Sequence, residues 1–431
     1  MSKNNKKNKY KKKSDYIKMI SSLHKAWEEL RKHPNKDTEG LDGISINDFL
    51  ADYSIRIEEI TEKLLSNKFR FQPLRRTIVE KGREILIQSV EERIVSEAIL
   101  QVIGPSLEKI NSNHDFSRRL ISLENGVKPK FHGIPLAVEI IQNNFKNGYV
   151  WVLEADIKGF FDNVPKKKVF ELISKHIKDS KILELIKQVV YFTPVVSNKK
   201  DAKQYDQSKG IAQGSPLSPL LASIYLYEFD KYIVEKFPHV RLVRYVDDFI
   251  ILCKDEATAK EMYQEIMIKL ADMELGMYAL GEVNKNGTEK TKITCAKWYG
   301  SHSFDFLGLS FNYIDIDITS KKKLEIEKKL REIINAQGNF LQKTRRIESR
   351  LRGYIEHYKW RHYTRTVPSL VKIINFSQIE LRKYYVRSYK GITRKEPFEG
   401  FSNSTINNLY RFMGIDFNDI LKLATSAQKN N

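Results

Sequence analysis

Two adjacent aspartates, Asp247 and Asp248, lie between the apolar runs at residues 240–243 and 249–252. Such runs on either side of a short turn predict a β-hairpin with both carboxylates at its tip. Carboxylate oxygens on a rigid turn suit hard divalent cations, which also bridge substrate phosphates. Asp-Asp is common in ordinary turns as well, because aspartate bonds its own backbone there. The pair indicates phosphoryl transfer only if other segments deliver further ligands.

A third carboxylate ends a second predicted strand. Residues 150–156 are β-branched and aromatic, which predicts a buried strand that delivers Asp156 at its end. A carboxylate there is costly without a cation or a partner, so Asp156 is the first candidate metal ligand. Asp162 is interpreted as a helix start rather than a catalytic group. Pro165 favours the first turn of the helix predicted by the apolar spacing of residues 169–177.

A loop of small residues and prolines spans residues 210–219, before the apolar run 220–226. Its backbone can approach a ligand closely, and the helix that follows offers its N-terminus to anionic groups. Gln213 in this loop could then contact a nucleotide edge or a phosphate. An ordinary loop entering a buried helix explains the same pattern.

The composition favours a polyanionic partner. The 431 residues include 74 Lys and Arg against 54 Asp and Glu, a formal net charge of +20, which indicates an anionic polymer rather than a small acidic substrate. No apolar run reaches membrane-spanning length and residues 1–13 are polar, so we expect a soluble cytoplasmic protein without a membrane partner. Cys253 and Cys295 lack metal-like spacing and are expected to be reduced core thiols. The length allows two or three domains.

Taken in order, three segments resemble motifs A, B and C of reverse transcriptases, most closely those of the bacterial group II intron-like lineage. They read DIKGFFDNV at 156–164, GIAQGSPLSPLLA at 210–222 and RYVDDF at 244–249. The resemblance continues into shorter segments that are similar to the motif D lysine region, the primer grip and the fingers motifs: residues 289–292, 306–308, 40–43, 75–76 and 81–83.

The resemblance implies an α+β fold of the right-hand polymerase type. Its palm is built on an antiparallel sheet with flanking helices, and its thumb is α-helical. The expected parts are a basic tail (1–15), fingers with N-terminal helices (16–149), a palm (150–318) with a fingers-proximal insertion around 191–210, a thumb (319–395) and a C-terminal extension (396–431).

The resemblance also implies RNA-directed DNA synthesis with two Mg²⁺ ions, for which Mn²⁺ is a possible substitute. Asp156 and Asp247 would hold the ions, Asp248 would complete the negative cluster, and the carbonyl of Ile157 would be a backbone ligand. Lys290 would protonate the departing pyrophosphate, and a solvated loop lysine is the alternative.

The incoming nucleotide would be selected by Phe161, at the position where relatives place a bulky side chain against the ribose 2′-hydroxyl. An ordinary core role is the alternative for this phenylalanine. The remaining candidates for substrate contact are Gln213, Gly214, Tyr245, Arg75, Arg76, Lys81 and Arg83, and surface solvation is the alternative for each of the basic ones.

Nucleic acid would be held by basic residues outside the site. The lysine-rich tail is expected to be solvated and to follow a phosphate backbone. The other candidates are Arg118, Arg119, Arg345, Arg346, Arg350 and Arg352. Tyr354 and Tyr358, spaced four apart, are interpreted as packing the helices of the thumb. The expected partners are an RNA template, the cDNA product and dNTPs, with homo-oligomers possible.

Residues 111–119 depart from the serine, glycine, aromatic and arginine pattern that intron-encoded relatives show there. The departure points away from a mobile-intron enzyme. The chain resembles stand-alone bacterial reverse transcriptases of anti-phage defence, some of which copy a structured non-coding RNA. A group II intron maturase is the first alternative, and a CRISPR-linked or retron enzyme is the next.

Overall fold

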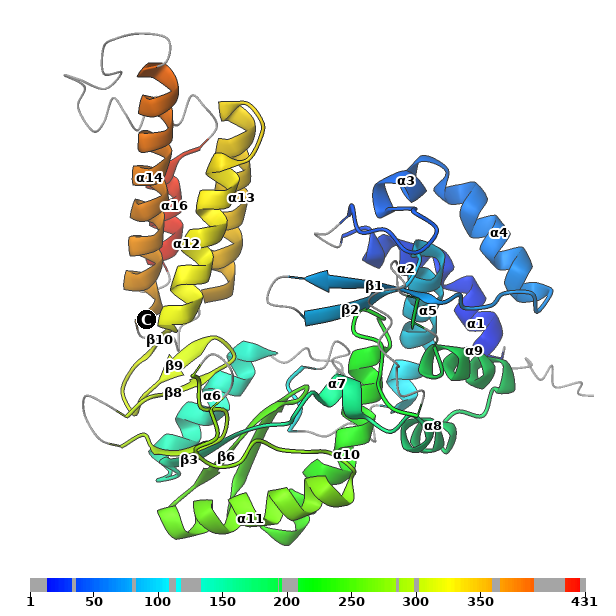
Figure 1. Ribbon diagram of the computed structural model, residues 1–431, viewed down its shortest axis with the longest axis horizontal. Coiled ribbons are helices and arrows are strands. Elements are labelled where there is room, and N and C mark those ends of the chain that lie inside the picture. The colour runs from blue at the N-terminus through cyan, green and yellow to red at the C-terminus, as the bar shows by residue number, and fades with distance from the viewer. Residues whose placement is uncertain are drawn as a thin grey trace, which may run out of the picture. The chain divides into compact units, whose positions relative to one another are not determined.

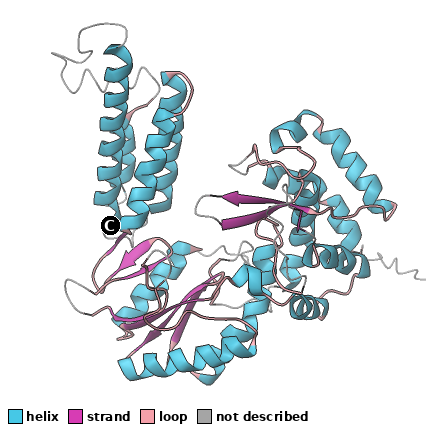
Figure 2. Cartoon of the chain, in the orientation of Figure 1, coloured by secondary structure: helices cyan, strands magenta, loops and turns pink. Residues whose placement is uncertain are grey.

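The structure is a computed structural model that describes residues 14–32, 36–79, 83–107, 114–117, 133–192, 194–195, 208–283, 287–297, 302–358, 365–390 and 415–426. Helices and small sheets alternate along the chain (Figures 1 and 2). The chain forms two compact units: Met1–Gly133, Ala155–Phe249 and Lys260–Lys292 make the first, and Ile134–Glu154, Ile250–Ala259 and Ile293–Asn431 make the second. This division runs through the predicted palm, so the expected domain boundaries stay predictions.

The N-terminal part of the first unit is helical, as predicted. Its helices are α1 (Asp15–Ser21), α2 (Leu23–Leu30), α3 (Ile46–Ala51), α4 (Tyr53–Leu65) and α5 (Val90–Leu107). Ser14 caps α1, and Ser45 with Asp48 forms a capping box at the start of α3. Trp27 of α2 is buried and packs on aromatic rings of α3 and α4. These contacts explain why short helices are stable here.

A three-stranded sheet in the order β2-β1-β4 follows these helices in the first unit. It consists of β1 (Leu74–Val79), β2 (Arg83–Ile87) and β4 (Pro194–Val195). β1 and β2 pair in an antiparallel hairpin. The described residues of the predicted insertion around 191–210 include β4, which pairs with β1 in parallel. A small apolar cluster of Leu74, Leu86, Phe192 and Ala212 holds this sheet against the loop that contains Gln213.

The sheet that carries the candidate catalytic residues has the strand order β5-β6-β3-β7. Its strands are β3 (Trp151–Asp156), β5 (Arg241–Tyr245), β6 (Asp248–Cys253) and β7 (Lys292–Cys295). The neighbouring helices are α6 (Ile134–Lys146), α7 (Phe160–Asn163), α8 (Lys166–Ser174), α9 (Ser180–Val190), α10 (Ser218–Lys236) and α11 (Glu256–Asp272). The predicted strands of the 240–252 hairpin and the buried helix after residue 217 are confirmed. Phe229 of α10 packs edge-on against Phe249 of β6, with ring centroids 5.1 Å apart.

The expectation that Asp162 starts a helix is wrong, because α7 already begins at Phe160. Asp162 lies in the first turn of α7, a single turn that starts after Gly159 in the left-handed conformation, with φ of 53°. The expected helix is α8, and Pro165 is its N-cap. The glycine permits a reversal that the apolar spacing alone does not reveal.

The second unit contains a three-stranded sheet and a set of long helices. The sheet is an antiparallel meander of β8 (Phe304–Phe306), β9 (Leu309–Phe311) and β10 (Ile316–Ile318). The helices are α12 (Ser320–Asn335), α13 (Phe340–Tyr358), α14 (Thr366–Lys390) and α16 (Phe417–Ser426). The helices predicted after residue 319 and the core position of Tyr358 are confirmed, whereas Tyr354 is only half-buried. Within the expected C-terminal extension, α16 packs against α13 and α14 and buries Phe417 and Ile420.

Two expectations about the whole chain can be compared with the described residues. None of the helices described is both long enough and apolar enough to cross a bilayer. Neither cysteine is in a disulfide; Cys253 is buried, as expected, whereas Cys295 is only half-buried.

Candidate active site

The turn between β5 and β6 holds both hairpin aspartates in place. Val246, which precedes them, has φ of 60°. A β-branched residue in the left-handed region costs about 1–3 kcal/mol and persists only where its surroundings fix it. Asp247 is half-buried, and Asp248 opens β6 with an exposed side chain. The turn therefore presents both carboxylates at the end of the sheet.

The electrostatics show that three carboxylates gather at this point. Loss of water around Asp248, followed by the charges of Asp247 and Asp156, raises the pKa of Asp248 to about 7, and Lys290 opposes the rise. Asp248 still has an exposed surface, so we attribute the rise in its pKa chiefly to the charges of Asp247 and Asp156. The site therefore concentrates negative charge that calls for a cation.

The third carboxylate ends β3 and meets a lysine. Lys290 Nζ donates to Asp156 Oδ2, and each side chain is 34% exposed. Partial burial acts to lower the pKa of Lys290, but the hydrogen bond and the charge of Asp156 outweigh it and raise that pKa above its ordinary value. Lys290 is therefore a protonated donor beside the carboxylates.

The loop that carries Lys290 is tied back to the strand that carries Asp156. Tyr278 N–H donates to the Asp156 carbonyl at 3.2 Å. Lys158 pairs with Glu282 at 2.9 Å, and the Glu282 carbonyl accepts from the Lys290 N–H at 3.3 Å. These contacts keep Lys290 within reach of Asp156.

The donor set fits a divalent cation in its chemistry. Carboxylate oxygens are the ligands that Mg²⁺ prefers, and the repulsion around Asp248 is what a bound cation would relieve. Within the described residues, however, no three acidic, histidine or cysteine side chains are close enough to share one ion. Lys290 supplies the compensating charge at Asp156 instead.

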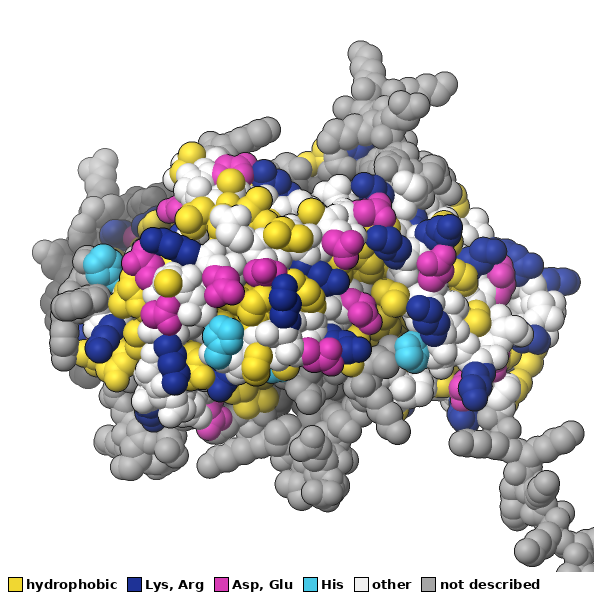
Figure 3. Space-filling model, turned by 90° about the horizontal axis from the view of Figure 1, so that it is seen from below, with side chains coloured by type: hydrophobic (Ala, Val, Ile, Leu, Met, Phe, Trp, Pro, Cys, Tyr) yellow, Lys and Arg dark blue, Asp and Glu magenta, His cyan; other side chains and the backbone are white. Residues whose placement is uncertain are grey.

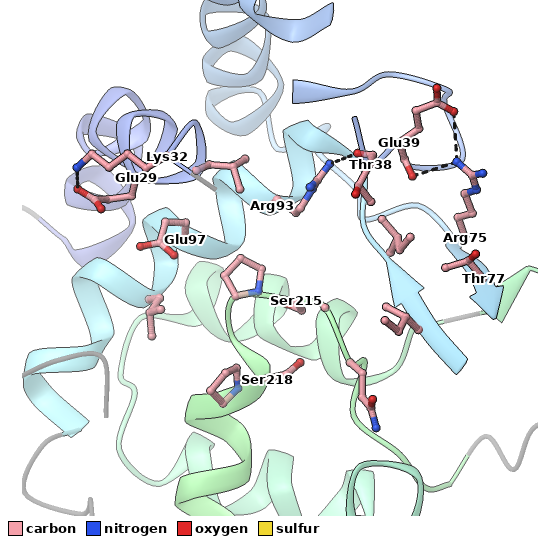
Figure 4. A pocket seen from close by; sticks show the side chains of 18 of the residues that line it. Glu29, Lys32, Thr38, Glu39, Arg75, Thr77, Arg93, Glu97, Ser215 and Ser218 are labelled. Atoms are coloured by element: carbon pink, nitrogen blue, oxygen red, sulfur yellow. Dashed lines mark hydrogen bonds and ion pairs between the residues drawn. The ribbon is translucent and has the colours of Figure 1, made fainter. Parts of the chain in front are cut away.

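A cavity of about 1260 Å³ in the first unit collects the nucleotide-contact candidates. Arg75, Phe161, Gln213 and Gly214 all line it. Its walls come from α2, β1, β2, α5 and the loop before α10 (Figure 4). Arg75 is paired there with Glu39 at 3.3 Å. These four predicted substrate contacts, which come from segments far apart in the sequence, thus line the same cavity.

Gly214 is where the 210–219 loop meets β2. Its φ is +125°, and a Cβ built on it would lie 2.7 Å from the Leu86 carbonyl oxygen. The adjacent Gln213 carbonyl accepts from the Leu86 N–H at 3.1 Å. Only glycine allows both the conformation and this approach of two backbones.

Phe161 and its neighbour Phe160 divide two roles between them. Phe160 is 1% exposed and belongs to the core. Phe161 is half-buried and is one of the residues that line the cavity. Its carbonyl accepts from the Ile211 N–H at 2.7 Å, which fixes it against the 210–219 loop.

The remaining nucleotide-contact candidates are placed less directly. Arg76 is buried and does not line the cavity, because adjacent strand residues point to opposite faces of the sheet. Tyr245 is half-buried at the end of β5, and Ile157, next to Asp156, has a buried side chain. Lys81, Arg118 and Arg119 lie outside the described residues, and Arg83 begins β2 without a described side chain.

Comparison with known families identifies the chain. A family model described as reverse transcriptase (RNA-dependent DNA polymerase) matches residues 76–311. The chain belongs to the reverse transcriptase family. The match includes Asp156, the two hairpin aspartates and Lys290, and together with the mixed helices and sheets it confirms the predicted right-hand polymerase fold class.

Relatives of this reverse transcriptase include intron-encoded proteins. An uncharacterized 91 kDa protein in the cob intron of Schizosaccharomyces pombe is 31% identical over 212 residues, which are 48% of this chain and 24% of that protein. The group II intron-encoded protein LtrA of Lactococcus lactis is 27% identical over 215 residues, 49% of this chain and 33% of LtrA. A solved structure of apo telomerase from Candida tropicalis aligns with a TM-score of 0.46 and 14% identity, covering 88% of this chain and 70% of that one. The chain thus spans a quarter to a third of the length of these two intron-encoded relatives.

The predicted thumb arginines of the reverse transcriptase fall into two groups. Arg345, Arg346 and Arg350 are exposed on α13. Arg352 is paired with Glu348 at 2.8 Å and with Asp419 of α16 at 2.7 Å, which correlates with the packing of α16 on α13. The first group is available to a ligand, whereas Arg352 joins two helices.

Side chains of both charges are exposed on this protein. On the face of the molecule seen in Figure 3, basic and acidic side chains are interspersed. The net charge of +20 is therefore not gathered among the coloured side chains of this face. The exposed arginines of α13 are a candidate surface for a polyanion.

Sequence reasoning gave no role to several residues that shape the site. Arg93 of α5 is buried in the cavity wall, where its Nη2 donates to the Thr38 carbonyl at 2.9 Å. Arg244 is fully buried between Asp115 and Asp230. The sequence does indicate that Arg244 has a buried partner, because a charge inside an apolar strand requires one. The identity of that partner is not contained in the local pattern.

Proposed function

We propose that this chain is an RNA-directed DNA polymerase that uses two Mg²⁺ ions. The observation that carries the proposal is the gathering of Asp156, Asp247 and Asp248 beside a protonated Lys290. A cavity lined by Phe161 and by the 210–219 loop is built in the same unit. The family match supports the same activity.

Each residue has a defined part in this proposal. Asp156, Asp247, Asp248 and the Ile157 carbonyl would hold the ions, which when bound activate the primer hydroxyl and neutralise the triphosphate. Lys290, whose pKa is raised by its bond to Asp156, keeps a proton that it can donate to the leaving pyrophosphate. Arg75 and Gln213 line the space for the nucleotide. The partners would be an RNA template, dNTPs and the cDNA product.

Phe161 would make the product DNA rather than RNA. Because Phe161 lines the cavity and Phe160 fills the core, Phe161→Ala should open space for a 2′-hydroxyl. We expect the preference for dNTPs over rNTPs to fall by at least about tenfold. Single-nucleotide incorporation with matched dNTP and rNTP measures this ratio. Phe160→Ala is the control, and its main effect should be a lower stability of the fold. An unchanged ratio in the Phe161 variant would assign the sugar selection to another residue.

The exposed arginines of α13 would bind the nucleic acid. Replacing Arg345, Arg346 and Arg350 together by Gln should weaken RNA binding, lower the slope of log affinity against log salt by about 2–3 and shorten the products. Arg352→Gln should mainly lower the melting temperature, since Arg352 pairs within the protein. Binding curves over a salt series and gel analysis of product length test the difference. Equal salt slopes for the triple variant and wild type would exclude this surface.

We further propose a role in bacterial anti-phage defence, with a dedicated structured non-coding RNA as template. Support comes from residues 111–119, which depart from the intron-type pattern. The similarity to intron-encoded proteins favours a group II intron maturase as the second candidate. Sequencing the nucleic acid that copurifies with the protein separates them. One abundant structured RNA with its cDNA supports the defence role, and intron RNA supports the maturase.

A further inference from the structure

A buried arginine lies directly behind the hairpin turn, between two carboxylates. Arg244 of β5 donates from Nε to Asp230 Oδ1 at 2.8 Å and from Nη2 to Asp230 Oδ2 at 2.5 Å. Its Nη1 donates to Asp115 Oδ2 at 3.1 Å. The side chains of Arg244, Asp115 and Asp230 are 0%, 0% and 2% exposed. This ionic cluster is therefore sealed from water.

The same ionic cluster contacts the backbone of the strained turn residue, Val246. Arg244 Nη1 also donates to the Val246 carbonyl at 2.7 Å. The Val246 N–H points to Asp115 Oδ1 at 3.5 Å. Val246 is the residue with φ of 60° that immediately precedes Asp247. Both backbone polar groups of this residue thus meet the buried cluster.

Asp115 is itself held rigidly. Its Oδ1 accepts from the Ser117 N–H at 2.9 Å and the Ser117 hydroxyl at 2.6 Å, and its Oδ2 accepts from the Ser223 hydroxyl at 2.7 Å. The backbone around it pairs with β5, because the Arg244 N–H donates to the His114 carbonyl at 2.8 Å. A side chain fixed by so many contacts can transmit a fixed geometry to its neighbours.

The need to neutralise the charge of Arg244 does not explain why Asp115 is buried beside it. Asp230 already binds the Arg244 guanidinium through two nitrogens. A second buried carboxylate adds a desolvation cost, and buried ion pairs contribute little net stability. What Asp115 adds, and Asp230 does not, is a contact with the turn that carries the candidate metal ligands.

We propose that Asp115 is a positioning residue that, directly and through Arg244, holds Val246 in the left-handed conformation and so orients Asp247 and Asp248. The inference rests on the proposed function and deepens it, because it assigns the alignment of the carboxylates to a segment outside motifs A to C. A backbone strain maintained by surrounding contacts is typical of such sites.

The test compares two isosteric substitutions that each remove one carboxylate from the same arginine. Asp115→Asn should weaken Mn²⁺ binding, followed by the electron paramagnetic resonance of free Mn²⁺, and should raise the Mg²⁺ half-saturation of primer extension, both by about tenfold. Asp230→Asn, which loses more contacts with Arg244, should lower the melting temperature at least as much and change Mn²⁺ affinity by less than about twofold. Equal losses of Mn²⁺ affinity in the two variants, or none in Asp115→Asn, would overturn the proposal.

A rescue experiment separates positioning from folding. Glycine adopts positive φ without strain, so Val246→Gly removes the need to hold the turn. The double variant Asp115→Asn with Val246→Gly should regain most of the lost Mn²⁺ affinity, whereas Val246→Gly should not restore the melting temperature of Asp230→Asn. Absence of rescue contradicts the proposal. Mn²⁺ binding is measured without nucleic acid, so the result stands even if the wild type makes no cDNA, an outcome that would refute the polymerase activity alone.

Discussion

Replacing Asp247 and Asp248 together by alanine should abolish Mg²⁺-dependent incorporation of dNTPs on an RNA template. The charges of the two carboxylates and of Asp156 act on one another, and Lys290 pairs with Asp156 beside them. Without the two hairpin carboxylates the ions that stabilise the transferring phosphoryl group would keep only Asp156 and the Ile157 carbonyl as protein ligands, and we expect less than about one thousandth of the wild-type rate. Primer extension with labelled dNTP measures it.

Two controls accompany this variant. RNA binding should be largely retained, because phosphate contacts by basic residues do not involve the hairpin tip. Asp162→Ala removes an exposed carboxylate of the same motif that lies in α7, and it should keep most of the activity. Full-rate synthesis by the double variant would refute the assignment of Asp247 and Asp248 as catalytic residues.

Gly214→Ala is expected to have the second largest effect. The new Cβ would lie 2.7 Å from the Leu86 carbonyl oxygen, which is backbone and cannot turn aside. The 210–219 loop must then separate from β2, which displaces Gln213 and Phe161 from the cavity wall. A displacement of about 1 Å lowers the rate by about 10²-fold, so incorporation should fall by that amount. Steady-state kinetics with varied dNTP measures both the rate and the apparent affinity.

Gly148→Ala is the matched control for this substitution. Gly148 also has a positive φ, +84°, but a Cβ added there would have no atom within 4 Å of it. It therefore shares the backbone strain and lacks the collision. We expect a small loss of thermal stability and near wild-type synthesis. Equal activity in both variants would show that the approach of the loop to β2 is dispensable.

The sequence was sufficient for features that depend on local pattern. The apolar runs beside Asp247 predicted the hairpin of β5 and β6. Features that depend on distant partners were not predictable in this way. Arg352 was expected on the nucleic-acid surface, but its partner Asp419 lies in a helix far along the chain.

The same limit explains why the surroundings of some site residues could not be predicted. Arg75 and Arg76 are adjacent arginines that cannot be told apart in the sequence. Adjacent residues of a strand point to opposite faces, so Arg75 lines the cavity and Arg76 is buried. Asp115 gave no signal, because its role arises from contacts with Arg244 and Val246 that long-range folding creates. Sequence motifs thus identify the reactive groups, and the tertiary structure identifies the residues that orient them.

The discontinuous make-up of the two units has a consequence for synthesis on the ribosome. The first unit needs residues up to Lys292, and the second combines residues 134–154 with α16 near the end of the chain. A nascent chain that is half made can complete neither core, and its apolar strands stay exposed until most of the protein has emerged. Translation speed and chaperone supply, rather than the stability of the finished fold, should therefore govern the yield of active protein.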